Sequence, residues 1–466
     1  MKLYSENEDY KLYQGNMLDM LEVIEPNSID SIITDPPYEL NFMNKGWDNS
    51  GIAFQKETWE KCYQALKSGG YLLAFGGSRT FHRIACAIED AGFEIRDTIM
   101  WLYGSGFPKS LNIGLAIDKK NGVDNRTGNI VKGVGSNNTN SMKNGLGESQ
   151  EFANEYEERI AQNEWQGWGT ALKPSFEPII VARKPFKGSL VDNVIEYGVG
   201  GINIYECRVE NTNADSYDLE KRQISKATGS NNDGHFLDEL HNKDAKHGVT
   251  NLGRFPANTI LTYDETDFEE VCGGFPNTKG NGNIRHNKND GKGYNCYSNY
   301  GDCDTKGYDD SGSASRYFYC AKASKKDRDE GLDDFEEKTA GQRTNRKEGS
   351  AGINAYAGAT GKARNIHPTV KPTELMQYLV RLVSPNGAII LDPFNGSGST
   401  GKAVMYENKE RNKNYKYIGI ELTEEYLPIS KARIEYISNI NNIYEKKETN
   451  ITNNSDKQMT IFDYIN

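Results

Sequence analysis

The chain has 466 residues, which is enough for about two or three domains with a buried core. Its hydrophobic fraction of 36%, aromatic fraction of 11% and net charge of −11 indicate a soluble globular protein with polar loops and exclude a protein coated in positive charge. No apolar run reaches the roughly eighteen residues that a membrane span needs, and the first residues lack the pattern of a signal peptide, so we expect a cytoplasmic protein.

Strands and helices alternate in the first 185 residues. The patterns predict, in order, a strand at 11–14, a helical turn at 17–23, a strand at 28–34, a helix at 58–66, a strand at 71–75, a helix at 79–91 and strands at 98–103 and 176–182. Ser68-Gly69-Gly70 is predicted to stop the helix before it, and the Gly- and Asn-rich residues 121–150 to form a mobile loop or linker. This alternation predicts a mostly parallel α/β sheet with helices on both faces.

The middle of the chain has a different character. Isolated apolar segments stand among polar and Gly-rich stretches between residues 186 and 364, which predicts a separate, loop-rich domain. We therefore divide the chain into residues 1–185, 186–364, 365–440 and a flexible tail at 441–466. Basic runs at 183–187, 316–328 and 343–364 stand out against the acidic background and are predicted to meet phosphate groups.

Regular structure returns near residue 365. A helix is predicted at 373–383 with Thr373 as its N-cap, followed by a strand at 388–391, a glycine-rich turn, a helix at 401–408, a strand at 417–420 and a helix at 424–440. The glycines let a ligand approach the backbone at the start of a helix, and an acid at the end of the next strand can bind a ribose hydroxyl. Glu421 follows Gly398 by about twenty residues, which is the spacing that such an acid requires. The pattern predicts a bound nucleoside.

The same turn has an alternative interpretation as a phosphate-binding loop. Gly396 and Gly401-Lys402 stand at the spacing of that loop, but the next residue should carry a hydroxyl that holds magnesium. Ala403 stands there instead, which disfavours a nucleotide triphosphatase.

A second motif, Asp35-Pro36-Pro37-Tyr38, follows the apolar run 29–33. Prolines end a strand and stiffen the turn after it, because proline has no donor N–H and a fixed φ. Asp35 is then expected at the carboxyl edge of the sheet, where open α/β folds bind their ligands. The alternative is a Pro-rich turn with a solvated Asp.

Together, Asp35-Pro36-Pro37-Tyr38 and Asp392-Pro393-Phe394-Asn395-Gly396-Ser397-Gly398 resemble the motifs of the amino-group DNA methyltransferases that use S-adenosyl-L-methionine. The motif order is similar to that of their beta class. The stretches 167–174 and 367–372 resemble those of adenine-specific methylases from bacteria and phages. The resemblance covers roughly residues 10–185 and 365–436, and it implies a Rossmann-like methyltransferase sheet with an inserted target-recognition region.

The resemblance also implies roles for matching residues. Asp35, Pro36, Pro37 and Tyr38 would form the catalytic motif, in which Asp35 and the carbonyl of Pro36 accept hydrogen bonds from the target amino group and Tyr38 stacks on the base. The residues implied to bind the cofactor are Asp392, Phe394, Gly396, Ser397, Gly398 and Thr400 around the turn, Glu421 at the ribose, Thr369 and Lys371 near the methionine end, and Asp19 near the adenine.

The target is expected to be N6 of adenine in double-stranded DNA, reached by flipping the base out of the helix at a cost of a few kcal/mol. Asp at position 35 is the more usual first residue of adenine-specific members. Cytosine-N4 is the alternative, followed by RNA or protein acceptors on the same fold and by a DNA-binding module without catalysis. No cysteine follows a proline, which argues against methylation at ring carbon.

The cysteines and the C-terminal residues bear on metal binding and on partners other than DNA. The seven cysteines are scattered without a Cys-x-x-Cys pair, so we expect reduced thiols and no metal; a zinc site at Cys296 and Cys303 is the alternative. Gln458-Met459-Thr460-Ile461-Phe462 resembles peptides that dock on bacterial sliding clamps, with an ordinary amphipathic tail as the alternative. Whether the protein forms a homodimer is left open by the sequence. No nuclease motif appears, so a solitary methyltransferase of bacterial or phage origin is the simpler expectation.

Overall fold

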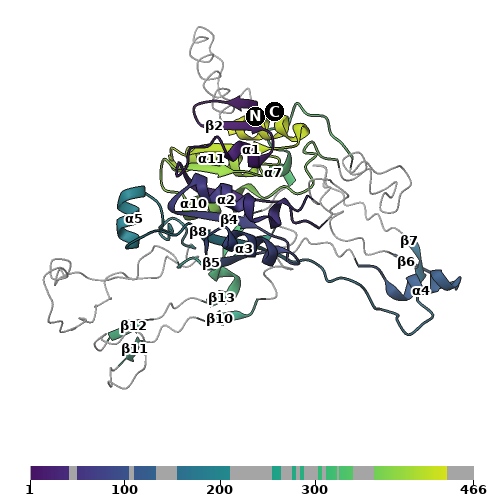
Figure 1. Ribbon diagram of the computed structural model, residues 1–466. Coiled ribbons are helices and arrows are strands. Elements are labelled where there is room, and N and C mark those ends of the chain that lie inside the picture. Colours follow the sequence, from purple (N-terminus) through teal and green to yellow (C-terminus); the bar gives the residue numbers. More distant parts are fainter. Residues whose placement is uncertain are drawn as a thin grey trace, which may run out of the picture.

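The computed structural model describes residues 2–40, 50–103, 110–132, 155–209, 254–263, 275–279, 284–287, 303–306, 311–322, 325–339 and 362–437. Within these residues the main sheet has ten strands, and helices cover both of its faces (Figure 1). In spatial order the strands are β1 (Lys2–Glu6), β2 (Tyr10–Gln14), β16 (Lys416–Glu421), β15 (Ile389–Asp392), β3 (Ile29–Thr34), β4 (Leu66–Phe75), β8 (Phe176–Arg183), β5 (Glu94–Tyr103), β9 (Thr259–Tyr263) and β14 (Tyr319–Lys322).

The centre of the sheet is parallel. Strands β2, β16, β15, β3 and β4 run in one direction, as do β5, β9 and β14. Strand β8 runs antiparallel to its neighbours β4 and β5, and β1 runs antiparallel to β2 at the edge. The prediction of a mostly parallel α/β sheet with helices on both faces is confirmed.

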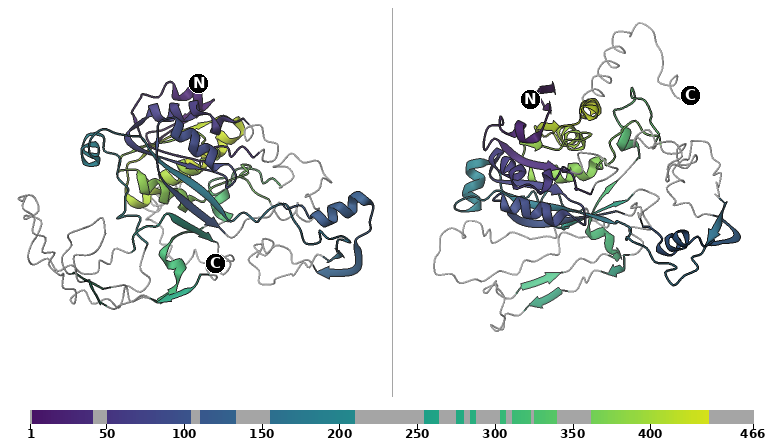
Figure 2. Two further views of the ribbon diagram at one scale, coloured as in Figure 1. Left: turned by 60° about the horizontal axis from the view of Figure 1, so that its bottom comes forward. Right: turned by 45° about the vertical axis from the view of Figure 1, so that its right-hand side comes forward.

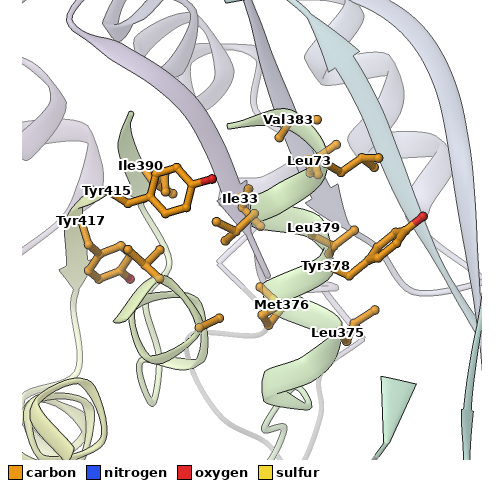
Figure 3. Packing of buried hydrophobic residues seen from close by; sticks show 14 of the residues in the cluster. Ile33, Leu73, Leu375, Met376, Tyr378, Leu379, Val383, Ile390, Tyr415 and Tyr417 are labelled. Atoms are coloured by element: carbon orange, nitrogen blue, oxygen red, sulfur yellow. The ribbon is translucent and has the colours of Figure 1, made fainter. Parts of the chain in front are cut away.

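Apolar side chains pack on both faces of the sheet. Leu73 of β4 joins one layer and Leu72 the other, because successive side chains of a strand point to opposite faces. One layer contains α10 (Thr373–Val383) and α11 (Ser399–Arg411); Figure 3 shows side chains of α10 against Ile33, Leu73 and Ile390. The other layer contains α1 (Met17–Leu21), α2 (Lys56–Ala65) and α3 (Phe81–Asp90). Burial on both sides explains the continuous apolar stretches at residues 71–75 of β4 and 179–182 of β8.

The predicted glycine stop after α2 is wrong. The helix ends at Ala65, and β4 begins at the next residue, Leu66, whose φ of −76° and ψ of 139° are extended. Ser68-Gly69-Gly70 therefore lies inside the strand. Gly69 has φ +80°, and a Cβ there would lie 2.2 Å from Nδ2 of Asn193. The glycine makes room for α5 (Leu190–Tyr197) at the end of the sheet.

The predicted N-cap of α10 is also wrong. The cap residue is Pro372, and Thr373 is the first residue of the helix. The backbone N–H of Thr373 donates to Asp327 Oδ2 at 2.7 Å, so a distant carboxylate satisfies the start of the helix.

An arm stands away from the main sheet in Figures 1 and 2. It contains α4 (Ile113–Asn121) and the antiparallel pair of β6 (Arg126–Lys132) and β7 (Glu155–Arg159). The loop prediction is wrong for residues 126–132, and residues 133–150 lie outside the described part of the chain.

The region between residues 186 and 364 contributes to the main sheet. Strands β9 and β14 extend it beyond β5, and α7 (Lys325–Asp329) contacts α10 and α11 through Asp327. Two short antiparallel pairs are β10 (Asn277–Lys279) with β13 (Ser311–Ser313), and β11 (Ile284–Asn287) with β12 (Cys303–Lys306). The division into domains stays a prediction. After the turn Glu424–Tyr426 a helix runs over residues 427–437, and the tail lies outside the described residues.

Candidate active site

The two motifs meet at one edge of the sheet. Strands β3 and β15 are parallel neighbours, so the turns that follow them emerge side by side. Thr34 Oγ1, at the end of β3, donates to Asp392 Oδ1, at the end of β15, at 2.6 Å. This hydrogen bond joins residues that are 358 positions apart in the chain.

A cavity of about 1470 Å³ opens at this edge and is lined by both motifs. Ligand pockets usually measure about 300–1,000 Å³, so this cavity is larger than a usual pocket for one ligand. The predicted site residues that line it are Asp35, Pro36, Pro37, Tyr38, Thr369, Lys371, Asp392, Phe394, Gly396, Ser397, Thr400 and Glu421.

The other two predicted residues lie just outside the lining. Asp19 is exposed on α1, while Gly15, Asn16 and Met17 line the cavity. Gly398 has φ +76°, and a Cβ there would lie 2.5 Å from Ser430 Oγ. This glycine therefore lets the turn pack closely on the last helix.

Asp392 holds the glycine-rich turn in shape. Its Oδ1 accepts hydrogen bonds from Thr34 and from the backbone N–H of Phe394, and its Oδ2 accepts one from Thr400 Oγ1 at 2.7 Å. Burial raises the pKa of Asp392 to about 6. Both oxygens are thus engaged within the protein, and the carboxylate orders the turn.

Glu421 lies at the end of β16, beside the same turn. Its Oε2 accepts from the backbone N–H of Gly396 at 2.6 Å and its Oε1 from that of Thr423 at 2.7 Å. Burial raises the pKa of Glu421 to about 7. Each carboxylate oxygen has a second lone pair, so each can also accept a hydrogen bond from a hydroxyl group of a ligand.

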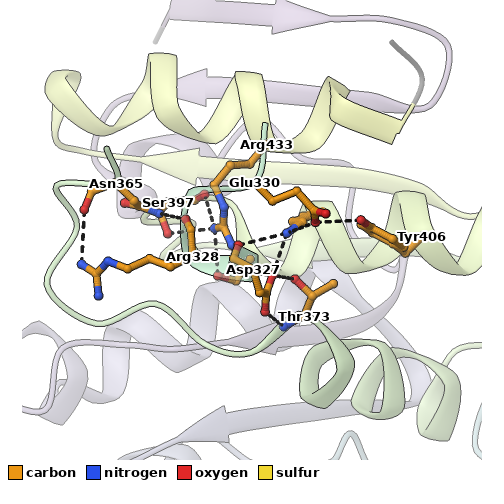
Figure 4. A network of polar contacts seen from close by, with 10 residues as sticks. Asp327, Arg328, Glu330, Asn365, Thr373, Ser397, Tyr406 and Arg433 are labelled. Atoms are coloured by element: carbon orange, nitrogen blue, oxygen red, sulfur yellow. Dashed lines mark hydrogen bonds and ion pairs between the residues drawn. The ribbon is translucent and has the colours of Figure 1, made fainter. Parts of the chain in front are cut away.

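Lys402 is turned away from the glycine-rich turn. Its fully buried ammonium lies 2.6 Å from Asp327 Oδ1 and 2.7 Å from Glu330 Oε2, in the polar network of Figure 4. The lysine of a phosphate-binding loop must reach the phosphates of the ligand. Lys402 is committed to two carboxylates instead, so the alternative of a nucleotide triphosphatase is rejected.

Asp35 follows β3 directly and lines the same cavity as Glu421. Its Oδ2 accepts a hydrogen bond from Lys371 Nζ at 2.6 Å. Its Oδ1 is buried without a hydrogen-bond partner among the described residues. Burial raises the pKa of this carboxyl group. A buried acceptor without a partner is costly, which points to a hydrogen-bond donor on a ligand.

The ring of Tyr38 is held from two sides. Its hydroxyl donates to Glu177 Oε2 at 2.7 Å, and its backbone carbonyl accepts from Thr80 Oγ1 at 2.8 Å. The flat ring at the cavity is therefore fixed before any ligand arrives, as a stacking platform requires.

A family model described as DNA methylase, of the N6/N4 methyltransferase type, matches residues 29–432. This chain belongs to that family. The cofactor of these DNA methylases is S-adenosyl-L-methionine.

Three known proteins illustrate the likeness. M.HindIII, a type II methyltransferase of Haemophilus influenzae, is 22% identical over 236 residues, which are 41% of this chain and 64% of that protein. M.HpaI of Haemophilus parainfluenzae is 35% identical over 108 residues, which are 22% of this chain and 34% of that protein. The chain thus spans less than two thirds of both relatives. The structure of the cytosine-N4-specific PvuII DNA methyltransferase aligns over 93% of this chain and 92% of its own, with 13% identity and a TM-score of 0.36.

The residues present in this chain fit the cofactor of the family. Gly396 has φ +52°, and a Cβ there would lie 2.9 Å from Nε2 of His367, so the turn has no room for a side chain. Phe394 packs against Trp59 with ring centroids 6.5 Å apart and lines the cavity, which suits a flat base. Glu421 offers acceptors for ribose hydroxyls.

Two residues of the site were missed by the sequence interpretation. Glu177 on β8 and Tyr103 on β5 both line the cavity, and the hydroxyl of Tyr103 donates to Glu177 Oε1 at 3.3 Å. The signal was available for Glu177, because it is an acid inside the apolar run 176–182. Charged side chains inside buried strands are rare unless they are paired.

The prediction that basic runs meet phosphate is wrong for Lys184. Its ammonium is buried and donates to the backbone carbonyls of Tyr63 and Leu66, each at 2.7 Å. The neighbouring Arg183 pairs with Glu94 at 2.8 Å. These residues hold the sheet together. Of the other two runs, residues 323–324 and 343–361 lie outside the described residues.

No described helix has the length and apolarity to cross a membrane. No described group of three or more His, Cys, Asp and Glu side chains could hold a metal ion. Cys296 and the predicted clamp peptide at 458–462 lie outside the described part of the chain.

Proposed function

We propose that this methylase transfers the methyl group of S-adenosyl-L-methionine to the exocyclic amino group of adenine in double-stranded DNA. The observation that carries the proposal is Oδ1 of Asp35, which is buried without a hydrogen-bond partner among the described residues, in a residue that lines the same cavity as the glycine-rich turn. The site thus offers an acceptor for an N–H donor beside the place where the cofactor fits.

An exocyclic amino group is a poor nucleophile, because its lone pair is delocalised into the ring. Oδ1 of Asp35 accepts a hydrogen bond from one N–H, and the carbonyl of Pro36 accepts one from the other. These bonds favour a tetrahedral nitrogen whose lone pair faces the reaction centre. The cofactor, when bound, supplies an electrophilic methyl group on a positively charged sulfur.

The target base must leave the double helix to reach Asp35. Flipping costs a few kcal/mol, and stacking on an aromatic ring returns about 1–3 kcal/mol per base. Tyr38, whose ring is fixed at the cavity, supplies this platform. Adenine is preferred over cytosine because the motif begins with Asp35 rather than with Ser.

The loop around the mouth of the cavity supports a duplex substrate. Residues 170–176 line the cavity, and Leu172 among them is 92% exposed. Trp165 and Trp168 lie just before it and are also exposed. Exposed apolar side chains beside a base pocket suit contact with unstacked base pairs.

The proposed reaction is tested by incubating the protein with S-adenosyl-L-methionine labelled in its methyl group and mixed-sequence duplex DNA. The DNA is then digested to nucleosides and the labelled nucleoside is identified. We expect N6-methyladenosine in its deoxy form. Label in N4-methylcytosine would overturn the base assignment, and label in RNA or protein without label in DNA would overturn the substrate class.

Cofactor affinity is expected to weaken as the pH falls through about 7, the pKa of Glu421. The ionised carboxylate accepts hydrogen bonds from both ribose hydroxyls, whereas the protonated one has lost an acceptor site. Calorimetric titration should therefore give a Kd about tenfold weaker at pH 6 than at pH 8. Glu421→Gln should bind weakly at both pH values, and a wild-type Kd that does not change with pH would contradict this role.

A further inference from the structure

The side chain of Lys371 lines the cavity beside Asp35, on the side where the target base is proposed to bind. It is 5% exposed, and its ammonium lies 2.6 Å from Asp35 Oδ2 and 3.4 Å from Glu177 Oε2. Aromatic rings surround it, with centroids at 4.9 Å for Phe75, 5.3 Å for Tyr38 and 5.9 Å for Trp101. Ring faces attract a cation, so the cage favours the charged form of the lysine.

Burial and the two charged neighbours, Lys371 and Glu177, together determine the protonation of Asp35. Burial favours the neutral carboxyl and raises its pKa, the charge of Lys371 opposes this, and the charge of Glu177 adds to it. Burial also favours a neutral lysine, but its two carboxylate neighbours outweigh this and raise the pKa of Lys371. The titratable and charged groups that face this pair are Glu177, Tyr38, Tyr103, His367 and Asp392.

Glu177 connects the lysine to the stacking ring. One of its oxygens accepts from the Tyr38 hydroxyl and faces the Lys371 ammonium, and the other accepts from Tyr103. The carboxylate of Glu177 therefore contacts both the hydroxyl of the Tyr38 ring and the ammonium of Lys371. Its residue comes from β8, outside both sequence motifs.

We propose that Lys371 and Glu177 are positioning residues for methyl transfer. Lys371 keeps Asp35 ionised and binds its Oδ2, so that Oδ1 stays free for the target amino group. Glu177 holds the Lys371 ammonium and the Tyr38 ring in their places. This inference rests on the proposed function, and it assigns Lys371 to the acceptor base rather than to the methionine end of the cofactor.

The contacts favour this assignment over a direct role in cofactor binding. An ammonium has three donors, and the ammonium of Lys371 contacts the carboxylates of Asp35 and Glu177 and lies over the ring of Phe75. Reaching a cofactor carboxylate would require it to leave Asp35 buried without a counter-charge, which is costly.

The test compares the pH dependence of kcat/KM in Lys371→Met, Glu177→Gln and the wild type, on a short methylatable duplex. Activity needs ionised Asp35, so the acid limb of the profile reports its pKa. Removing the positive charge in Lys371→Met should move this limb upward by about one to three pH units and lower kcat/KM at pH 7 by at least about tenfold. Glu177→Gln removes a negative charge near the carboxylate of Asp35 and should therefore move the acid limb to lower pH.

Controls separate this role from a general loss of structure. Lys67→Met removes the lysine of another ion pair, 2.6 Å from Asp30, and should leave the acid limb unchanged. Lys371→Arg keeps the charge and should return the limb toward its wild-type position. An unshifted limb in Lys371→Met, or a cofactor Kd at least tenfold weaker with unchanged kcat, would overturn the proposal.

A second readout does not require activity. In thermal unfolding, Lys371→Met should lower the Tm less in the Asp35→Asn background than in the wild type, because part of its cost is the unpaired carboxylate of Asp35. Equal losses in the two backgrounds would overturn the coupling. A wild type that methylates no DNA would instead reject the proposed function, while this cycle still tests the ion pair.

Discussion

Asp35→Ala is expected to lower kcat for methyl transfer by about 10²- to 10⁴-fold while the cofactor Kd stays within about threefold of the wild-type value. The substitution removes Oδ1, the acceptor proposed for the target amino group, and Oδ2, the partner of Lys371. The cofactor turn should survive because Asp392 is held by Thr34 and Thr400 rather than by Asp35. Single-turnover kinetics and calorimetric titration measure the two quantities separately.

Two further variants sharpen this experiment. Asp35→Asn keeps the shape and one acceptor oxygen but loses the charge, so kcat should lie between those of the wild type and Asp35→Ala. Asp124→Asn is a matched control, because Asp124 is exposed and pairs with Arg126 on the arm. Loss of cofactor affinity with normal kcat in Asp35→Ala would show that the two halves of the cavity have been assigned the wrong roles.

The placement of the motifs could be predicted because it follows from local rules. A residue that ends a buried parallel strand lies at the carboxyl edge of the sheet, wherever the strand falls in the sequence. Asp392 and Glu421 each end such a strand, Asp35 directly follows one, and the three strands β3, β15 and β16 are neighbours. Residues separated by hundreds of positions could therefore be placed in one cavity.

The partners of the charged side chains could not be predicted in this way. Lys371 bonds to Asp35 across 336 positions, and Lys402 to Asp327 across 75. Neither contact has a sequence period, since each depends on how segments from different parts of the chain pack. The prediction that Thr373 is the N-cap of α10 failed for the same reason, because the N–H of Thr373 donates to the distant Asp327.

The glycines after α2 show the limit of a local rule. Glycine beyond the last turn is a frequent helix stop, and Ser68-Gly69-Gly70 has that appearance. The chain becomes extended earlier, at Leu66, because that residue is fully buried and pairs with Ile29 of β3. Tertiary packing overrides the local signal, and Gly69 serves the contact with Asn193 instead.

Lys402→Met is expected to lower the free energy of unfolding by about 3–5 kcal/mol. The lysine is fully buried, and its removal takes away the ammonium that pairs with the carboxylates of both Asp327 and Glu330. Asp327 also holds the start of α10 through Thr373, so the loss reaches three helices (Figure 4). Urea denaturation at pH 7 measures the change.

The size of this loss should depend on pH. Burial alone would raise the pKa of Asp327, but the ammonium of Lys402 outweighs it and holds that pKa below its usual value. A lowered pKa in the folded protein contributes stability above the unfolded value of about 3.9, and this contribution is lost as the pH falls further. The difference between wild type and Lys402→Met should therefore be largest near neutral pH and should shrink below about pH 4.

A matched substitution tests whether burial is the cause. Lys416 pairs with Asp9 at 3.0 Å on the surface, where the two side chains are 46% and 37% exposed. Lys416→Met should cost less than about 1 kcal/mol, because water screens an exposed pair. If the cost of Lys402→Met arises from two carboxylates that have lost their shared ammonium, adding Asp327→Asn and Glu330→Gln should recover part of it, since neutral amides need no counter-charge. A triple variant no more stable than Lys402→Met would place the cost in the packing of the lysine stem instead.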